Sequence, residues 1–216
     1  MNYNVNKTYH FSNRRGTGDQ YMDWFTIGKL TIANQGGIRA RSFWNQRKLK
    51  APYNVSSLIL LISNNHEKNK SVNPWEPAEF DQVGGKLIYK GDSRKYKKNS
   101  NVKDSRAKLE HMGNKQLRKI EMLLEDGNKL WLPPLLYFSS VSVGRYSFKG
   151  LFIAEKIETY FDESPEVEKE NYKIHCQRMK EESVPINWLR DRCRAADIEM
   201  FDNEFAPLSW QKRSAL

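Results

Sequence analysis

The chain has 216 residues, of which 38% are hydrophobic and 12% aromatic, and this is enough to build the core of one globular domain. Its formal net charge of +10 and its pI near 9.5 favour a polyanionic partner. No run of apolar residues approaches the length of a membrane span, and the polar start MNYNVNKTYH lacks the pattern of a signal peptide.

The first half of the chain predicts short strands and long loops. Residues 1–50 mix aromatic and polar residues with a glycine pair, which is typical of short strands joined by exposed loops. The apolar run SSLILLISN at residues 56–64 has the length of a buried central strand rather than a helix. Residues 65–85 then predict a long loop of the kind that is usually functional or disordered, and KLIYKG at 86–91 predicts a short strand.

The second half predicts one helix, two long strands and a charged tail. We expect the helix from about Asn114, because the residues after it form a broad apolar face that stops before Asp126-Gly127. The strands LWLPPLLYFSSVSV and YSFKGLFIAEKIETYF follow, with a turn at Gly144-Arg145. After Pro165 the sequence is charged and predicts helices, which Trp188 and Trp210 would hold against the sheet.

Cysteine and histidine usage bears on location and on metal binding. Cys176 and Cys193 are far apart without a CxxC pattern, and the four histidines have no metal-ligand partner at a useful spacing. This indicates a reducing, cytoplasmic compartment, and it favours neither a disulfide framework nor a zinc site.

The order of elements predicts an α+β fold. We expect a mostly antiparallel, strongly curved sheet or barrel in residues 1–165, with one helix across it, and a helical C-terminal extension at residues 166–216 packed on it. Strands and helices do not alternate, which argues against a doubly wound parallel sheet.

Positive charge is concentrated in one stretch. Residues 86–119 hold twelve Lys or Arg against three acids, a net charge of +9, whereas the other residues hold 24 basic and 23 acidic groups. This is the pattern expected where phosphates are neutralised, although a solvated basic loop is the alternative.

Short islands of sequence, in a particular order and spacing, resemble a known family. They run from about residue 24 to 212 and are QGGIR, NPWEPAEF, IYKGDSRK, MGNKQL, LPPLLYF, FKGLFIAEKIE and APLSWQK. They are similar to the N-terminal recognition domain of AspBHI/MspJI-type modification-dependent restriction endonucleases, which resembles the SET-and-RING-associated (SRA) fold, a PUA-like architecture that reads methylated cytosine. The resemblance implies a curved β-barrel core that extrudes a modified cytosine, such as 5-methylcytosine or 5-hydroxymethylcytosine, from double-stranded DNA into a pocket.

The resemblance also bears on catalysis and partners. Members of this family carry their nuclease C-terminal to the recognition domain, so it implies a module without catalytic residues, metal ligands or a cofactor of its own. Mg²⁺ would be needed only by a linked nuclease domain, and the location implied is cytoplasmic and nucleoid-associated, as in prokaryotes.

The predicted modified-base pocket centres on Asp92. A carboxylate can accept a hydrogen bond from cytosine N4, and by resemblance Asp92 occupies the position of the family's base-edge acid; an Asx turn or a local salt bridge is the alternative. Tyr89 would face the same side of its strand as Gly91 and stack on the base, or else it fills the core. Tyr96 or Trp75 is the candidate for the opposite wall, unless these aromatic residues cover the edge of the core.

A glycine segment near residue 37 is expected to approach the base closely. Gly36 and Gly37 leave room for an extra methyl group and can donate backbone N–H groups, although an ordinary tight turn explains them equally well. Arg39 and Arg41 follow, and they could probe a groove or fill the gap left by the extruded base.

The basic segment supplies the predicted phosphate contacts. Its candidates are Arg94, Lys95, Lys97, Lys98, Lys103, Arg106 and Lys108. Asn114 and Lys115 begin the predicted helix, where free N–H groups favour an anion; for Asn114 a plain N-cap role is an equal explanation.

Two other functions remain open at this point. An RNA-binding module on a related barrel would use the same lysines and aromatic residues. A self-contained nuclease would need an Asp with a well-spaced Glu-x-Lys on paired strands, and neither EVEKE nor IAEKIE supplies that arrangement convincingly.

Overall fold

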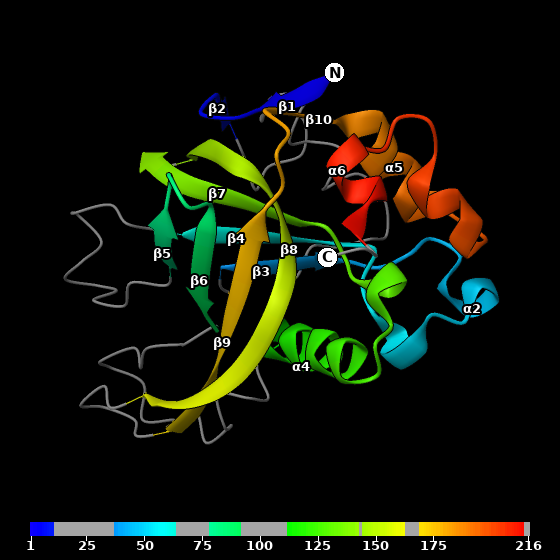
Figure 1. Ribbon diagram of the computed structural model, residues 1–216, viewed down its shortest axis with the longest axis horizontal. Helices are drawn as coiled ribbons and strands as arrows, with labels where there is room; N and C mark the ends of the chain where they lie inside the picture. The colour runs from blue at the N-terminus through cyan, green and yellow to red at the C-terminus, as the bar shows by residue number, and fades with distance from the viewer. Residues whose placement is uncertain (11–36, 64–77, 92–111, 143, 163–168, 214–216) are drawn as a thin grey trace.

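A computed structural model of the protein describes residues 1–10, 37–63, 78–91, 112–142, 144–162 and 169–213. Its main feature is an eight-stranded sheet, shown in Figure 1. In spatial order the strands are β3 (Ile38–Arg41), β4 (Leu58–Ser63), β7 (Leu135–Ser142), β8 (Arg145–Asp162), β9 (Lys169–Arg178), β6 (Lys86–Lys90) and β5 (Ala78–Asp81), and β2 (Thr8–His10) pairs with β8. Among these strands only β4 and β7 pair in parallel, so the predicted mostly antiparallel sheet is confirmed.

The remaining elements are short strands and helices. A second, two-stranded sheet joins β1 (Asn2–Asn4) to β10 (Ser183–Pro185). The helices are α2 (Gln46–Leu49), α4 (Met112–Glu125), α5 (Ile186–Arg194) and α6 (Leu208–Gln211), with 3-10 turns at Pro52–Asn54, Lys129–Trp131 and Ile198–Asp202. None of the helices in the described part of the chain is long and apolar enough to cross a membrane.

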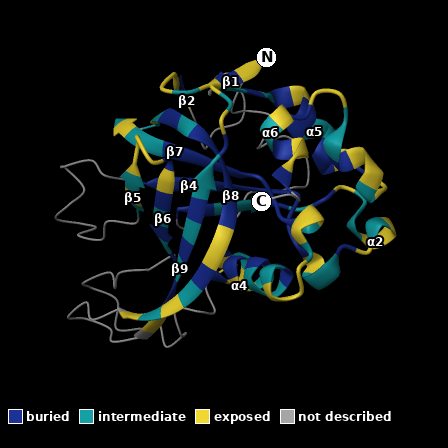
Figure 2. Cartoon of the chain, viewed as in Figure 1, coloured by how far each residue is buried: buried dark blue, intermediate teal, exposed yellow. Residues whose placement is uncertain are grey.

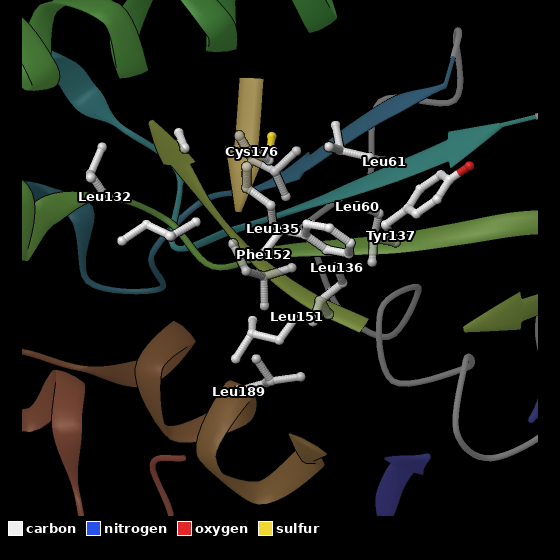
Figure 3. Packing of buried hydrophobic residues seen from close by; sticks show 14 of the residues in the cluster. Leu60, Leu61, Leu132, Leu135, Leu136, Tyr137, Leu151, Phe152, Cys176 and Leu189 are labelled. Carbon is white, nitrogen blue, oxygen red and sulfur yellow. The ribbon is translucent and has the colours of Figure 1, made fainter. Parts of the chain in front are cut away.

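The strand β4 lies inside the core, as its apolar sequence predicts. All six residues, LILLIS, are buried, with β3 on one side and β7 on the other. A strand that is covered on both faces has a continuous apolar sequence rather than an alternating one. This is why the segment lacks a polar face. Leu60 pairs with Leu136 of β7, which pairs in turn with Leu151 of β8, and Figure 3 shows these residues together, so one contiguous core includes three strands.

The sheet bends because its longest strand is irregular. The pairing of β7 with β8 shifts register between Tyr137 and Phe138, next to Gly150, whose φ of +138° lies in the region that favours glycine. A second shift lies between Ala154 and Lys156 in the pairing of β8 with β9. Bulges of this kind bend a strand and increase its twist, and β8 forms a long arc in Figure 1. The sheet remains open, with β3 and β5 at its two ends, so the expected curved sheet is confirmed but its closure into a barrel is not.

The helix α4 covers one side of the curved sheet. Its buried residues Leu117, Ile120 and Leu123 form the expected apolar face, and it packs against β3, β8 and β9. Soon after it ends, Gly127 adopts a φ of +69°, the left-handed conformation that commonly follows a helix. The predicted helix is therefore confirmed, with a start two residues before Asn114.

The prediction of a helical segment from residue 166 is wrong for residues 169–178. These residues form β9, which lies inside the sheet between β8 and β6. Tyr172, Ile174 and Cys176 are buried while Lys173 and His175 between them are more exposed, the alternation of a strand with one solvated face. The polar side chains on that face account for the charged composition, and the sheet extends past residue 165 to Arg178.

Helices do follow, and they form a cluster against the sheet. Figure 2 shows buried positions continuing from the sheet into α5 and α6. Trp188 and Trp210 are fully buried with ring centroids 5.6 Å apart. The buried Arg192 guanidinium lies over the Phe201 ring at 4.3 Å and donates 2.9 Å hydrogen bonds to the carbonyl oxygens of Ser57 and Leu132. The cluster is thus tied to the end of the sheet where β4 begins.

Candidate nucleic-acid interface

The end of β6 meets the end of β4, although these strands are not neighbours in the sheet. The Tyr89 hydroxyl donates a 2.8 Å hydrogen bond to the carbonyl oxygen of Ile62, and the Ile62 N–H donates at 2.8 Å to the carbonyl oxygen of Gly37. A Cβ atom on Gly37 would lie 1.9 Å from the Tyr89 hydroxyl oxygen and 2.5 Å from the Ile62 carbonyl oxygen. Glycine is therefore required here by close packing.

A second junction joins the end of β6 to β9 and α4. The Gly91 N–H donates to the Tyr172 carbonyl oxygen at 2.7 Å, and the Asn171 side-chain amide donates to the Gly91 carbonyl oxygen at 3.2 Å. The Asn114 amide of α4 donates to Asn171 Oδ1 at 2.9 Å, and this same oxygen accepts the Tyr172 N–H at 2.8 Å. Both asparagines are fully buried. We call Asn114 and Asn171 the asparagine pair.

Gly91 also occupies a position without room for a side chain. A Cβ atom there would lie 2.4 Å from Asn171 Oδ1 and 2.6 Å from Asn114 Oδ1. Each of the two described glycines predicted for the base pocket is therefore in close contact with polar atoms of the protein.

A charged cluster lies on the solvent face of β8 and β9. The Glu158 carboxylate accepts from Lys156 at 2.8 Å and contacts His175 Nε2 at 2.9 Å, and these hydrogen bonds, that of Lys156 first, lower the pKa of Glu158 to about 2. Lys173 is 3.8 Å from the same carboxylate and lies 5.2 Å from the centroid of the Tyr160 ring. Lys156 and Lys173 thus compensate the negative charge of this carboxylate.

The structure places Tyr89 and Gly91 on one face of β6, as expected from their spacing. The Tyr89 ring is fully buried, which corresponds to the alternative of a tyrosine that fills the core, and its stacking on a base stays a prediction. The other pocket candidates, Asp92, Tyr96, Trp75 and Gly36, lie outside the described residues, as do the phosphate candidates Arg94, Lys95, Lys97, Lys98, Lys103, Arg106 and Lys108.

The described DNA-binding candidates lie at different places. Arg39 is half-buried on β3, while Arg41 at the far end of that strand is 8% exposed, and burial lowers its pKa. Lys115 is exposed in the first turn of α4. Asn114 lies inside that turn, and its amide donates to β9 rather than facing solvent. A DNA contact by any of these residues stays a prediction.

Sequence reasoning did not identify Asn171 as a residue of this site. The sequence predicts a helical segment from residue 166, and this prediction does not pair Asn171 with the end of β6. The available signal was the alternation of apolar residues from Tyr172 to Cys176, which indicates a strand.

The comparisons with known proteins agree with this geometry. The family model described as "Restriction endonuclease AspBHI N-terminal" matches residues 3–214. The chain belongs to this family. The resemblance to the N-terminal domain of AspBHI-type restriction endonucleases that was noted in the sequence is thereby confirmed. A search of curated proteins found no match.

Three solved structures share the fold. The DNA modification-dependent restriction endonuclease AspBHI is 21% identical with a TM-score of 0.68, over 100% of this chain and 91% of that chain. The MspJI restriction endonuclease in complex with a 27-mer oligonucleotide is 23% identical with a TM-score of 0.71, over 98% of this chain and 51% of that one. The DNA recognition domain of the cytosine modification-dependent restriction endonuclease LpnPI is 18% identical with a TM-score of 0.61, over 99% and 88% of the two chains. The chain thus spans about half the length of the MspJI chain.

Proposed function

We propose that this chain binds double-stranded DNA, turns a modified cytosine out of the helix and reads it at the end of β6. The observation that carries this proposal is the junction at Gly91, where β6, β9 and α4 meet at the start of residues 92–111. This segment contains Asp92 and seven of the twelve Lys and Arg residues of the basic stretch 86–119. Membership of the AspBHI N-terminal family supports it independently.

The chemistry of a flipped cytosine fits the residues available. Eversion costs a few kcal/mol of unstacking, and a protein offsets this cost with new stacking and hydrogen bonds. Asp92, directly after Gly91, would accept from the exocyclic N4, the pairing that geometry assigns to Asp or Glu. Stacking of the base on an aromatic side chain, with Tyr96, Trp75 and Tyr89 as the candidates, would add about 1–3 kcal/mol.

Affinity would come from the basic segment. Each neutralised phosphate of duplex DNA steepens the plot of log K against log salt by about 0.9. Lysines such as Lys97 and Lys98 would supply this affinity for any sequence, whereas Asp92 would add a base contact that only an everted cytosine can make. Since MspJI is about twice the length of this chain, we further propose that cleavage and its Mg²⁺ belong to a linked nuclease domain.

The test is binding of the whole chain to matched duplexes with cytosine or 5-methylcytosine at one position. We expect tighter binding to the methylated duplex, and increased fluorescence from 2-aminopurine placed beside that position when the cytosine leaves the stack. Asp92→Asn should reduce the preference, while Lys97→Gln with Lys98→Gln should weaken both duplexes equally and reduce the salt slope by about 1.8. Equal affinity of the wild-type chain for both duplexes, or a preference for RNA of the same sequence, would refute the proposal.

A further inference from the structure

We propose that a basic surface on α2, α4 and the end of α5 holds the phosphate backbone of the same duplex several base pairs away from the modified cytosine. This inference rests on the proposed function for DNA as the partner, and it does not depend on how the base is read. We call this surface the basic track. Its cations are Lys115, Lys119, Lys50, Lys48, Arg47 and Arg194.

An exposed tryptophan of the track is held against α5 by its backbone. The Trp44 N–H donates at 2.7 Å to the Cys193 carbonyl oxygen, and the Asn45 side-chain amide donates at 3.4 Å to the Arg194 carbonyl oxygen. The preceding Phe43 is buried, yet the Trp44 side chain is 63% exposed. Tryptophan is usually well buried in a free chain and is enriched where proteins contact partners, so an anchored and exposed Trp44 indicates a contact surface.

The cations around Trp44 lack carboxylate partners. Several exposed lysines elsewhere are paired, as Lys86 is with Glu155 at 2.9 Å and Lys156 is with Glu158 at 2.8 Å. No Asp or Glu occurs in residues 24–66, which include α2. Unpaired like charges repel one another, and a polyanion relieves this repulsion. Within the described residues, no ion pair is made by the exposed Arg47, Lys48, Lys50 and Arg194.

The helix α4 continues the track toward Gly91. The Lys119 ammonium donates at 2.9 Å to the carbonyl oxygen of Asn54, in the turn that follows α2. Lys115 is exposed one helical turn earlier, and residues four apart lie on the same helix face. Asn114 beside it is bonded through β9 to the Gly91 junction. The track therefore extends from that junction to α2, which lies beyond the far end of α4 in Figure 1.

Acidic residues on the same elements do not cancel this charge. The helices α2, α4 and α5, with the residues directly after α2 and α4, hold nine Lys or Arg and four Asp or Glu, a net charge of +5. Of the four acids, Glu121 is paired with Arg118, and Asp126 accepts a hydrogen bond from Tyr53. The surface therefore keeps a positive charge that complements phosphates.

The length of α4 sets the distance between the two DNA contacts. Its 14 residues, at about 1.5 Å each, span about 21 Å. Duplex DNA rises about 3.4 Å per base pair, so this span corresponds to about six base pairs. A duplex that is read at the Gly91 end and runs along α4 would reach α2 and α5 at least about six base pairs away. The phosphates bound there would lie outside the immediate surroundings of the modified base.

The test uses two duplexes with a central 5-methylcytosine, one with about six base pairs on each side and one with about twelve. Arg47→Gln with Lys48→Gln removes two exposed cations of α2. The matched control, Arg145→Gln with Lys180→Gln, removes one exposed arginine and one exposed lysine outside the track and makes the same change in net charge. Binding of the whole chain is measured over a range of salt concentrations, and also on the same duplexes with unmodified cytosine.

The wild type should bind the long duplex more tightly than the short one and with a steeper salt slope. The α2 variant should reduce the slope on the long duplex by about 1.8, since each lost phosphate contact removes about 0.9. Its binding to the short duplex, and its ratio of affinities for 5-methylcytosine and cytosine, should not change. The control variant should keep the wild-type slopes. Trp44→Ala should weaken binding to the long duplex without changing the slope, because the indole carries no charge.

The outcomes separate this inference from the proposed function. An α2 variant with the wild-type slope on the long duplex, an equal effect of the control variant, or an equal loss on both lengths refutes the inference. A titration that finds two duplexes per chain assigns the track to a second duplex and also refutes it. A wild type without preference for 5-methylcytosine, but with a length effect that the α2 variant loses, refutes the proposed function and supports the track. A wild type that binds neither duplex refutes both.

Discussion

The contact of Tyr89 with Gly37 gives a quantitative prediction about how the curved sheet is held. Tyr89→Phe removes the donor of a 2.8 Å hydrogen bond to the buried Ile62 carbonyl oxygen. Loss of a partner from a buried polar group costs about 1–3 kcal/mol. Because 1 kcal/mol corresponds to about 2–4 °C in a chain of this size, the melting temperature should fall by about 2–12 °C.

Gly37→Ala should cost more in the wild-type background than in the Tyr89→Phe background. Its Cβ atom would lie 1.9 Å from the Tyr89 hydroxyl oxygen, 3.2 Å from Tyr89 Cζ and 2.5 Å from the Ile62 carbonyl oxygen. Overpacking of this kind typically costs about 1–3 kcal/mol. Removal of the hydroxyl group eliminates the closest of these contacts but leaves the contact with the backbone, so the relief should be partial.

The assay is a double-mutant cycle with thermal or urea unfolding of the wild type, both single variants and the double variant. We expect a coupling free energy of at least about 1 kcal/mol, with the double variant more stable than the sum of the single changes predicts. Additive costs, within about 0.5 kcal/mol, would show that the hydroxyl group and Gly37 do not compete for one space and would refute the reasoning.

Two further predictions concern ionisable groups. The pKa of Glu158, about 2, lies below its ordinary value of 4.5, so this carboxylate stabilises the fold above about pH 4.5 and loses that contribution as the pH falls toward 2. Melting temperatures should therefore be higher for the wild type than for Glu158→Gln at pH 7 and converge near pH 2, and a difference that grows on acidification would contradict this assignment. Cys176 and Cys193 are buried, and burial raises the pKa of both thiols. Mass spectrometry after treatment with iodoacetamide at pH 7.5 should find both unmodified in the native chain and modified in urea, whereas rapid labelling of the native chain would contradict their burial.

Local sequence patterns correctly predicted the elements whose signal lies within a short stretch of the chain. The run from Leu58 to Ser63 is covered on both faces, so hydrophobicity alone identifies it as a buried strand. The helix α4 has one apolar face and a glycine after its end, and both signals are local. The turn at Gly144 likewise depends on one residue with a φ of +72°.

Long-range pairing was not predictable in the same way. The strand β9 carries charged residues on its solvent face, and its high charge suggested a helix although its apolar residues alternate. Its place between β8 and β6 depends on partners far away in the sequence. The error about this strand also concealed Asn171, because the position of that side chain beside Gly91 exists only once β9 and β6 are paired.

The two glycines show how far a family motif can be interpreted from sequence alone. Gly37 was expected to leave room for an extra methyl group and Gly91 to line the base pocket, yet each is in close contact with polar atoms of the protein itself, the Tyr89 hydroxyl and the asparagine pair. Substitution of either glycine should therefore act first on the packing beneath the proposed pocket, and its effect on binding should parallel its effect on stability. Asp92, by contrast, should affect discrimination without an equal effect on stability, because its proposed partner is the base.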